Sequence, residues 1–295
     1  MRPDAFTRTT LDKAAHENFP VAPFFLPRGW RDDLMAIYGY ARLVDDIGDG
    51  DLAPGGADAR HLGAEGVTDR LVLLDAFEAD LRRVFDGIPA HPLLRTLQRT
   101  VRRHRLTPEP FLALIGANRQ DQLVRRYETY DDLVAYCRLS ADPVGRLVLG
   151  ITGTTSPERV RRSDAVCTAL QIVEHLQDVA EDLARDRIYL PAEDMKRFGV
   201  TEADLARPTA GAPVRALIAY EAERARRLLH EGIPLVGSVR GRLRLLLAGF
   251  VGGGHAALDA ITAAGHDVLP GRPKPTKTNL MRHVGTVLRR ARGER

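Results

Sequence analysis

Hydrophobic and polar residues follow each other along this chain with the three- and four-residue spacing of amphipathic helices almost throughout. Strand-like alternation bounded by turn residues is hard to find, so the pattern predicts an all-α protein. Helices are expected over residues 4–16, 30–49, 67–85, 89–105, 108–126, 130–139, 145–151, 157–182, 214–231, 239–264 and 278–292.

Loops are expected where proline and glycine gather. Residues 18–27 contain three prolines and are interpreted as an apolar loop, either a packed plug or a lid over an apolar pocket. Residues 51–66 are rich in Gly and Asp, and residues 270–277 form a linker. The pair Asp142-Pro143 interrupts the helical pattern around it.

The chain shows no short-period repeat and no shift in composition that would mark a second domain. We therefore predict a single domain over residues 1–295, with a core at about 15–275 and a basic tail at 276–295. In such a helical bundle, the active-site groups project inward from facing helices.

A first acidic stripe lies in the predicted helix over residues 30–49. Tyr38, Arg42, Asp45 and Asp49 are spaced i, i+4, i+7 and i+11, which places them along one face of that helix. Two carboxylates one turn apart repel each other unless a cation lies between them. The residues around these acids are mostly apolar, which indicates a buried helix rather than a solvated acidic face.

A second stripe of the same kind recurs downstream. Gln171, Glu174, Asp178 and Asp182 are spaced i, i+3, i+7 and i+11, again among apolar residues. If the two helices face each other, their carboxylates form an oxygen cage suited to Mg²⁺, which binds a few carboxylates together with waters and substrate phosphates. Taken alone, each pair of acids is more often a solvated helix face.

Charge and cysteine content exclude several classes of protein. Lys and Arg number 43 and Asp and Glu 39, a net charge of +4 that is not gathered into a block, so nucleic acid is not expected as a partner. Cys137 and Cys167 lie in apolar helical patterns and suggest a reducing cytoplasm. We find neither a signal peptide nor about 18 consecutive apolar residues, so any membrane contact is expected to be peripheral, on the inner face.

The two acidic stripes lie in segments, residues 38–49 and 171–191, that resemble the aspartate-rich regions of the squalene and phytoene synthase family. The resemblance continues through residues 136–145 and covers roughly residues 15–275. Within the family, residues 17–21 and 140–146 are most similar to the hydroxysqualene synthase branch, HpnC, of bacterial hopanoid pathways. The resemblance implies a class I isoprenoid synthase bundle with a central active-site cavity.

That branch implies a Mg²⁺-dependent conversion of presqualene diphosphate and water to hydroxysqualene and diphosphate, with two or three Mg²⁺ ions. The nearest alternative is head-to-head condensation of two prenyl diphosphates, such as farnesyl diphosphate, to presqualene diphosphate, squalene or phytoene. An alternative of another class is a non-catalytic helical scaffold that binds isoprenoids or pathway enzymes. The segment Gly252-Gly253-Gly254-His255 does not match a dinucleotide fingerprint, so NADPH is not expected. We interpret these glycines as small residues for close helix packing or as a helix interruption.

The family also implies roles for individual residues of this chain. Glu174 stands where many members carry Asn, and it either binds metal or pairs with an arginine such as Arg138 or Arg146. The implied metal ligands are Asp45, Asp49, Glu174, Asp178 and Asp182. Tyr38 and Arg42 match family positions near the diphosphate, and Gln171 matches one on the pocket wall. Arg187 is a basic side chain that is expected to assist Arg42 in neutralising the diphosphate. Asp46 and Glu181 are adjacent to the implied ligands and are expected to act as hydrogen-bond acceptors around them.

A carbocation formed in such a site is trapped by any water, so the pocket is expected to be apolar and mostly dry. Asp142, polar beside Pro143, is a candidate for placing the one reacting water, and a helix cap is an equal explanation. The candidates for the pocket wall, for which core packing is also sufficient, are Phe19, Phe24, Phe25, Tyr136, Leu139, Ala141 and Val144.

Overall fold

The structure is a computed structural model that describes residues 22–52 and 55–293. Over these residues it is helical with no strand, and an isolated parallel β-bridge joins Arg126 and Ile188. The all-α prediction is confirmed. The helix expected at residues 4–16 and the wall candidate Phe19 lie outside the described residues.

The chain divides into two compact units. The first comprises the described residues up to 123 together with 146–155, and the second comprises 124–145 and the residues from 156 onward. Helix α8 (Asp142–Ile151) begins in the second unit and ends in the first. The expectation of a single domain stays a prediction.

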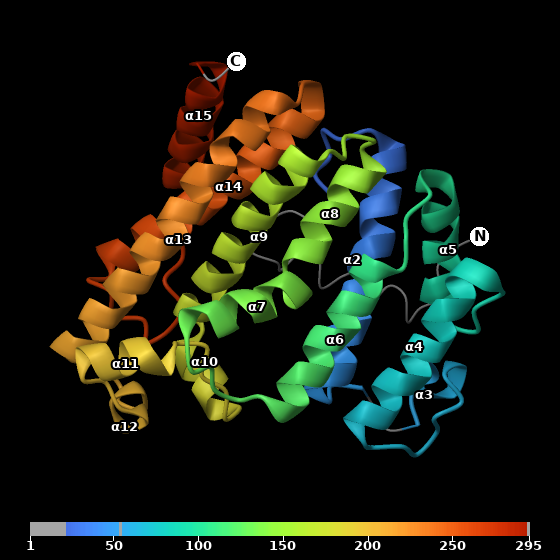
Figure 1. Cartoon of the computed structure of the whole chain (residues 1–295), viewed down its shortest axis with the longest axis horizontal. Helices are drawn as coiled ribbons and strands as arrows, with labels where there is room; N and C mark the ends of the chain where they lie inside the picture. The colour runs from blue at the N-terminus through green and yellow to red at the C-terminus, as the bar shows by residue number, and fades with distance from the viewer. Residues whose placement is uncertain (1–21, 53–54, 294–295) are drawn as a thin grey trace. The chain divides into compact units, whose positions relative to one another are not determined.

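Helix α2 is the centre of the first unit, where it packs against α4, α5 and α6. Tyr40 on α2 is fully buried, stacks on Phe77 at 5.5 Å, and donates a hydrogen bond of 2.8 Å from its hydroxyl to the carbonyl oxygen of Phe111. A short helix, α3, lies inside the predicted loop at 51–66. The helices of this unit are α2 (Arg28–Asp49), α3 (Ala57–His61), α4 (Arg70–Asp86), α5 (Pro92–His104) and α6 (Glu109–Leu123) (Figure 1).

The second unit is built around α9 and α13, which pack against each other, while α14 packs on α9, α13 and α15 (Figure 1). Its helices are α7 (Tyr130–Ser140), α9 (Pro157–Gln177), α10 (Val179–Ala184), α11 (Ala192–Phe198), α12 (Glu202–Leu205), α13 (Ala212–Ser238), α14 (Gly241–Ala263) and α15 (Lys277–Gly293).

Two helices of this unit refine the expectations. α13 continues beyond residue 231 to Ser238 with Pro234 inside it, because Leu235 and Val236 are buried and hold the last turns in place. α14 runs without a break through Gly252, Gly253 and Gly254, and a Cβ on Gly252 would lie 2.8 Å from the backbone nitrogen of Val284 on α15. The glycines therefore serve close helix packing.

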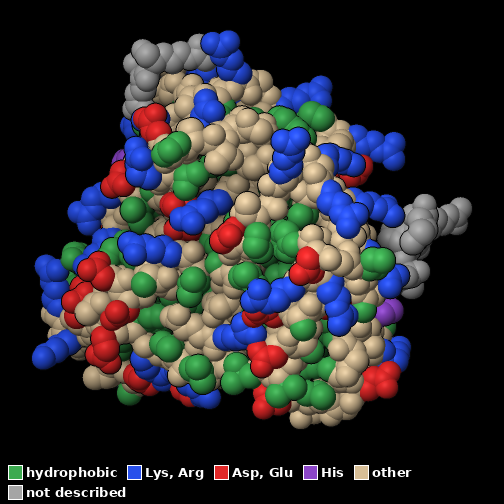
Figure 2. Space-filling model, turned by 45° about the vertical axis from the view of Figure 1, so that its right-hand side comes forward, with side chains coloured by type: hydrophobic (Ala, Val, Ile, Leu, Met, Phe, Trp, Pro, Cys, Tyr) green, Lys and Arg blue, Asp and Glu red, His purple; other side chains and the backbone are tan. Residues whose placement is uncertain are grey.

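Surface composition agrees with the mild net charge. On the face shown in Figure 2, Lys and Arg side chains are interspersed with Asp and Glu rather than gathered into one block. α14 is long and apolar enough to cross a membrane, which the sequence analysis did not anticipate, but 67% of its apolar stretch is buried inside the protein. That burial is what a core helix of a folded unit shows.

Candidate active site

The first acidic set lies on one uninterrupted helix, as the spacing predicted. Tyr38, Arg42, Asp45, Asp46 and Asp49 are all on α2, which ends immediately after Asp49 at Gly50 with a φ of 78°. Arg42 donates from Nη2 to a carboxylate oxygen of Asp46 at 2.8 Å. Asp46 therefore fixes the guanidinium of Arg42 one turn away on the same helix.

Asp45 carries a carboxylate whose charge is poorly compensated. It is accessible to water, and the protein atoms packed around it, reinforced by the charge of Asp49, raise the pKa of its carboxyl to about 7. The Nδ2 atom of Asn118 on α6 donates to Asp45 at 3.1 Å and opposes this rise. Sequence reasoning missed Asn118, for which Gly48 is a usable signal: a Cβ at Gly48 would lie 2.0 Å from the Asn118 side-chain oxygen.

The second acidic set is on two helices rather than one, which corrects the predicted helix through residue 182. α9 ends at Gln177, Asp178 follows with φ −108° and ψ 14°, and α10 then begins. The helical spacing nevertheless persists, because the backbone nitrogen of Asp178 donates to the Glu174 carbonyl at 3.0 Å and that of Asp182 to Asp178 at 2.8 Å. Glu174, Asp178 and Asp182 therefore still lie on successive turns of a nearly helical backbone.

Glu174 and Asp178 share an arginine that the sequence did not indicate. The Nη2 atom of Arg272 lies 3.1 Å from a carboxylate oxygen of each, so Glu174 pairs with an arginine other than the two named from the sequence. Burial raises the pKa of the Asp178 carboxyl to about 6; Arg272 opposes the rise and Glu174 adds to it. Repulsion among these acids is thus only partly relieved.

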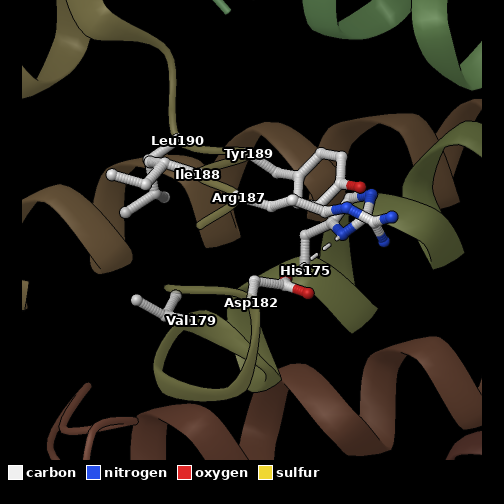
Figure 3. A pocket seen from close by; sticks show the side chains of 7 residues that line it. All are labelled: His175, Val179, Asp182, Arg187, Ile188, Tyr189 and Leu190. Carbon is white, nitrogen blue, oxygen red and sulfur yellow. Dashed lines mark ion pairs between the residues drawn. The ribbon is translucent and has the colours of Figure 1, made fainter. Parts of the chain in front are cut away.

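Asp182 lies in a small cavity with His175 and Arg187 (Figure 3). The cavity has a volume of about 10 Å³, room for roughly one water molecule. The Nδ1 atom of His175 is 3.6 Å from Oδ2 of Asp182, and that buried oxygen has no hydrogen-bond partner among the described residues. The lining residues are His175, Val179, Asp182, Arg187, Ile188, Tyr189 and Leu190.

His175 lies next to the second acidic set in sequence and contacts two of its residues, Gln171 and Asp182. Its Nε2 atom lies 3.1 Å from the side-chain nitrogen of Gln171, and its ring stacks on Tyr189 with centroids 3.7 Å apart. The buried ring of Tyr136, a predicted wall residue, lies 5.5 Å from Tyr189 and 6.1 Å from His175. An aromatic layer therefore borders the second acidic set.

The remaining candidates divide between core and solvent. Ala141 is buried, Leu139 is half-buried and Val144 is 38% exposed. Phe24 is 89% exposed, with its ring edge-on to Phe25, and its assignment to a pocket wall stays a prediction. Glu181 is also exposed and pairs with Arg185 at 3.3 Å, and its role as an acceptor around the ligands stays a prediction.

Asp142 is buried within the second unit. It is the first residue of α8, is 2% exposed, and accepts a hydrogen bond of 2.9 Å from the hydroxyl of Thr168 on α9. Burial is the main cause that raises the pKa of the Cys137 thiol, and it also raises the pKa of the Cys167 thiol to about 12; the charge of Asp142 adds to both shifts. These contacts favour a helix-packing role over the placing of a water.

Magnesium fits the donor chemistry of both acidic sets. In the part of the chain that the structure describes, no three His, Cys, Asp or Glu side chains converge on a point that could hold a metal ion. Each set nevertheless presents carboxylate oxygens, the ligands Mg²⁺ prefers. The raised pKa values of Asp45 and Asp178 and the unpartnered oxygen of Asp182 indicate negative charge that a divalent cation would stabilise.

Comparison with known proteins gives a consistent result. A sequence profile of the squalene/phytoene synthase family matches residues 13–279. Hydroxysqualene synthase of Zymomonas mobilis is 38% identical over 72% of this chain and 67% of its own length, and that of Rhodopseudomonas palustris is 33% identical over 76% and 72%. Phytoene synthase of Arthrospira platensis is 31% identical over 74% and 71%.

Solved structures show the same likeness. The crystal structure of squalene synthase HpnC from Alicyclobacillus acidocaldarius is 42% identical, with a TM-score of 0.76 over 90% of this chain and 97% of that one. A dehydrosqualene synthase in complex with a ligand has a TM-score of 0.82 over 98% and 96%, at 23% identity, which bears on the fold alone. The helical isoprenoid synthase fold is therefore confirmed.

Proposed function

The chain belongs to the squalene/phytoene synthase family, and from this premise we propose that it converts presqualene diphosphate and water to hydroxysqualene and diphosphate. The coarser statement, an enzyme that acts on prenyl diphosphates, follows from membership of the family. The finer one is supported chiefly by the 38% identity to a hydroxysqualene synthase over 72% of the chain.

The acidic residues of both sets are proposed to hold Mg²⁺. Asp45 and Asp49 would supply carboxylates from α2, and Asp178 and Asp182 would supply them from the junction of α9 and α10. When bound, Mg²⁺ neutralises the charge that develops on the departing diphosphate. Glu174 is proposed as a further ligand of the second set.

Two arginines are proposed to assist in neutralising the charge of the departing diphosphate. Arg42 is held by Asp46, so its guanidinium is oriented before substrate arrives. Arg187 lines the cavity that also contains Asp182 (Figure 3). Tyr38 and Gln171, one turn or more from the acids on α2 and α9, are proposed to contact the diphosphate and the isoprenoid respectively.

The reaction breaks the carbon–oxygen bond to diphosphate, and the electron pair leaves with the diphosphate. The cyclopropylcarbinyl cation rearranges, one water forms a new carbon–oxygen bond, and that water loses a proton. Capture by a single water requires that the rest of the pocket is dry. Buried aromatic and aliphatic side chains such as Tyr136, Tyr189 and Ala141 are proposed to exclude the other waters.

A second function is favoured by one observation, the 31% identity to a phytoene synthase. That reaction would be head-to-head condensation of two prenyl diphosphates. Purified protein should be incubated with Mg²⁺ and either presqualene diphosphate or farnesyl diphosphate. Hydroxysqualene formed only from presqualene diphosphate supports the proposed function, product from farnesyl diphosphate alone supports condensation, and no turnover of either supports a non-catalytic scaffold.

We also propose that the reaction needs no NADPH and takes place in the cytoplasm, at the inner membrane face. Addition of NADPH should leave the product unchanged, and conversion to squalene would contradict this. The proposed substrate and product are lipids, and the described residues 277–292 of α15 carry Lys and Arg with no Asp or Glu. The protein should therefore sediment with anionic vesicles more than with neutral ones.

A further inference from the structure

The segment that follows α14 approaches the second acidic set and places a cation there. Val268 and Leu269 are buried and anchor its beginning. The buried side chain of Gln177, the last residue of α9, donates to the carbonyl oxygen of Pro273 at 2.5 Å. Arg272 is thereby held over Glu174 and Asp178, within the same unit of the chain.

The contacts of Arg272 are those of a counter-ion rather than of a well-fitted structural arginine. A single nitrogen, Nη2, lies 3.1 Å from both carboxylates. Its Nε atom is buried and has no hydrogen-bond partner among the described residues. A bidentate arginine pair would use two nitrogens on one carboxylate. The guanidinium therefore neutralises two acids without the geometry that would make it hard to displace.

Mg²⁺ and the guanidinium of Arg272 would compete for the position between Glu174 and Asp178. Magnesium binds carboxylate oxygens at about 2.0–2.1 Å in octahedral geometry. Arg272 already contacts one carboxylate oxygen of Glu174, Oε1, and one of Asp178, Oδ2, so a Mg²⁺ ion bridging these two oxygens would have to take its place. A divalent cation on these oxygens would lie next to the guanidinium, and two cations at that separation repel each other strongly where the surroundings are partly buried.

We propose that Arg272 is an internal competitor of the metal: it occupies the position between Glu174 and Asp178 and must leave when Mg²⁺ binds, which releases residues 270–276. The inference rests on the proposed function in that it takes Asp178 as a metal ligand. It also accounts for Glu174, which stands where many members of the family carry a neutral Asn. The negative charge of Glu174, added to that of Asp178, holds the guanidinium of Arg272 in place.

Metal affinity without substrate tests the competition directly. Mn²⁺ binding, followed by electron paramagnetic resonance, should be about tenfold tighter in Arg272→Gln than in the unmodified protein, because the competing charge is gone. Arg272→Lys keeps the charge and should stay near the unmodified value. Arg215→Gln removes an arginine that pairs with Asp267 at 2.9 Å in the same unit, and it should change nothing. Equal or weaker Mn²⁺ binding by Arg272→Gln overturns the proposal.

Hydrogen exchange supplies a second measurement that needs no substitution. Adding Mn²⁺ to the unmodified protein should speed exchange at the backbone amides of Gly271, Arg272 and Lys274, since the segment is released. Unchanged or slower exchange there overturns the proposal. Failure of the proposed function looks different: tighter metal binding in Arg272→Gln with no turnover of either prenyl diphosphate preserves the competition, whereas turnover without that tightening preserves only the function.

Discussion

The side-chain amide of Asn118 donates a hydrogen bond of 3.1 Å to a carboxylate oxygen of Asp45, joining α6 to the first acidic stripe on α2. A hydrogen bond to the ionised form of a carboxyl lowers its pKa. Here that effect opposes the protein atoms packed around the carboxyl and the charge of Asp49, which together raise the pKa of Asp45 to about 7. Asn118 therefore favours the charged form that a metal ion requires.

Asn118→Leu should raise the pKa of Asp45 above about 7, because the volume is kept and the donor is lost. If ionised Asp45 binds metal, the acidic limb of the pH profile of kcat/KM moves to higher pH by the same amount. The carboxyl carbon chemical shift of Asp45, titrated by nuclear magnetic resonance, measures the pKa without turnover. A titration curve identical to that of the unmodified protein would contradict the prediction.

Asp45→Asn should stabilise the protein at pH 8 and leave its stability almost unchanged at pH 4. The folded-state pKa of Asp45 is raised from 3.8 to about 7, so the folded protein binds more protons than the unfolded chain between these values. The free energy of unfolding of the unmodified protein therefore falls as pH rises from about 4 to 7. The neutral amide does not titrate, and melting temperatures measured across this range should diverge with increasing pH.

Gly48→Ala should destabilise the first unit, because a Cβ at this position would lie 2.0 Å from the Asn118 side-chain oxygen. Overpacking of this kind costs about 1–3 kcal/mol. Gly116→Ala on α6 is the matched control, since nothing lies within 4 Å of its Cβ and a helical alanine gains about 0.5–1 kcal/mol over glycine. Urea unfolding should therefore change in opposite directions in the two variants, and equal changes would contradict the packing argument.

Spacing along the chain was sufficient to predict the first acidic set. Tyr38, Arg42, Asp45 and Asp49 lie on α2 as expected, because a helix of this length fixes which side chains share a face. For the second set the residues were predicted, but the end of α9 at Gln177 was not. No Pro or Gly near Asp178 indicates in the sequence that the helix ends there. The regular i+4 backbone hydrogen bonds hide it in the pattern.

Long-range partners could not be predicted. Arg272 lies 98 residues from Glu174, and nothing in the surrounding sequence distinguishes it from nearby arginines. Pro234 misled the prediction in the other direction. Proline usually ends a helix, but α13 continues past Pro234 because Leu235 and Val236 are buried on the same helix. The apolar character of Phe24 likewise did not predict its exposure. Each miss concerns tertiary packing, which the local pattern does not encode.

Thr168→Val should destabilise the second unit by about 1–3 kcal/mol, because it removes a donor from the buried carboxylate of Asp142 without changing volume much. Thr168→Ser keeps the hydroxyl and should recover most of the loss. Denaturant midpoints of the two variants and the unmodified protein make the comparison. Equal midpoints for valine and serine would show that the hydrogen bond of 2.9 Å contributes nothing.

Asp178→Asn should lower turnover of presqualene diphosphate by about 100-fold or more, because a neutral amide stabilises the metal and the departing diphosphate less than a carboxylate does. The fold should survive, since Asp178 stands between α9 and α10, and burial, which raises the pKa of its carboxyl to about 6, makes its charged form less favourable in the folded protein than in the unfolded chain. The far-ultraviolet circular dichroism is therefore expected to match that of the unmodified protein.

Asp131→Asn supplies the control, because this exposed acid lies in the first turn of α7 and in neither acidic set. It should leave turnover unchanged. If Asp178→Asn lost helical signal together with activity, the acid would be structural, and the magnesium role would fail. If it kept full activity, the second set would not bind the catalytic metal at all.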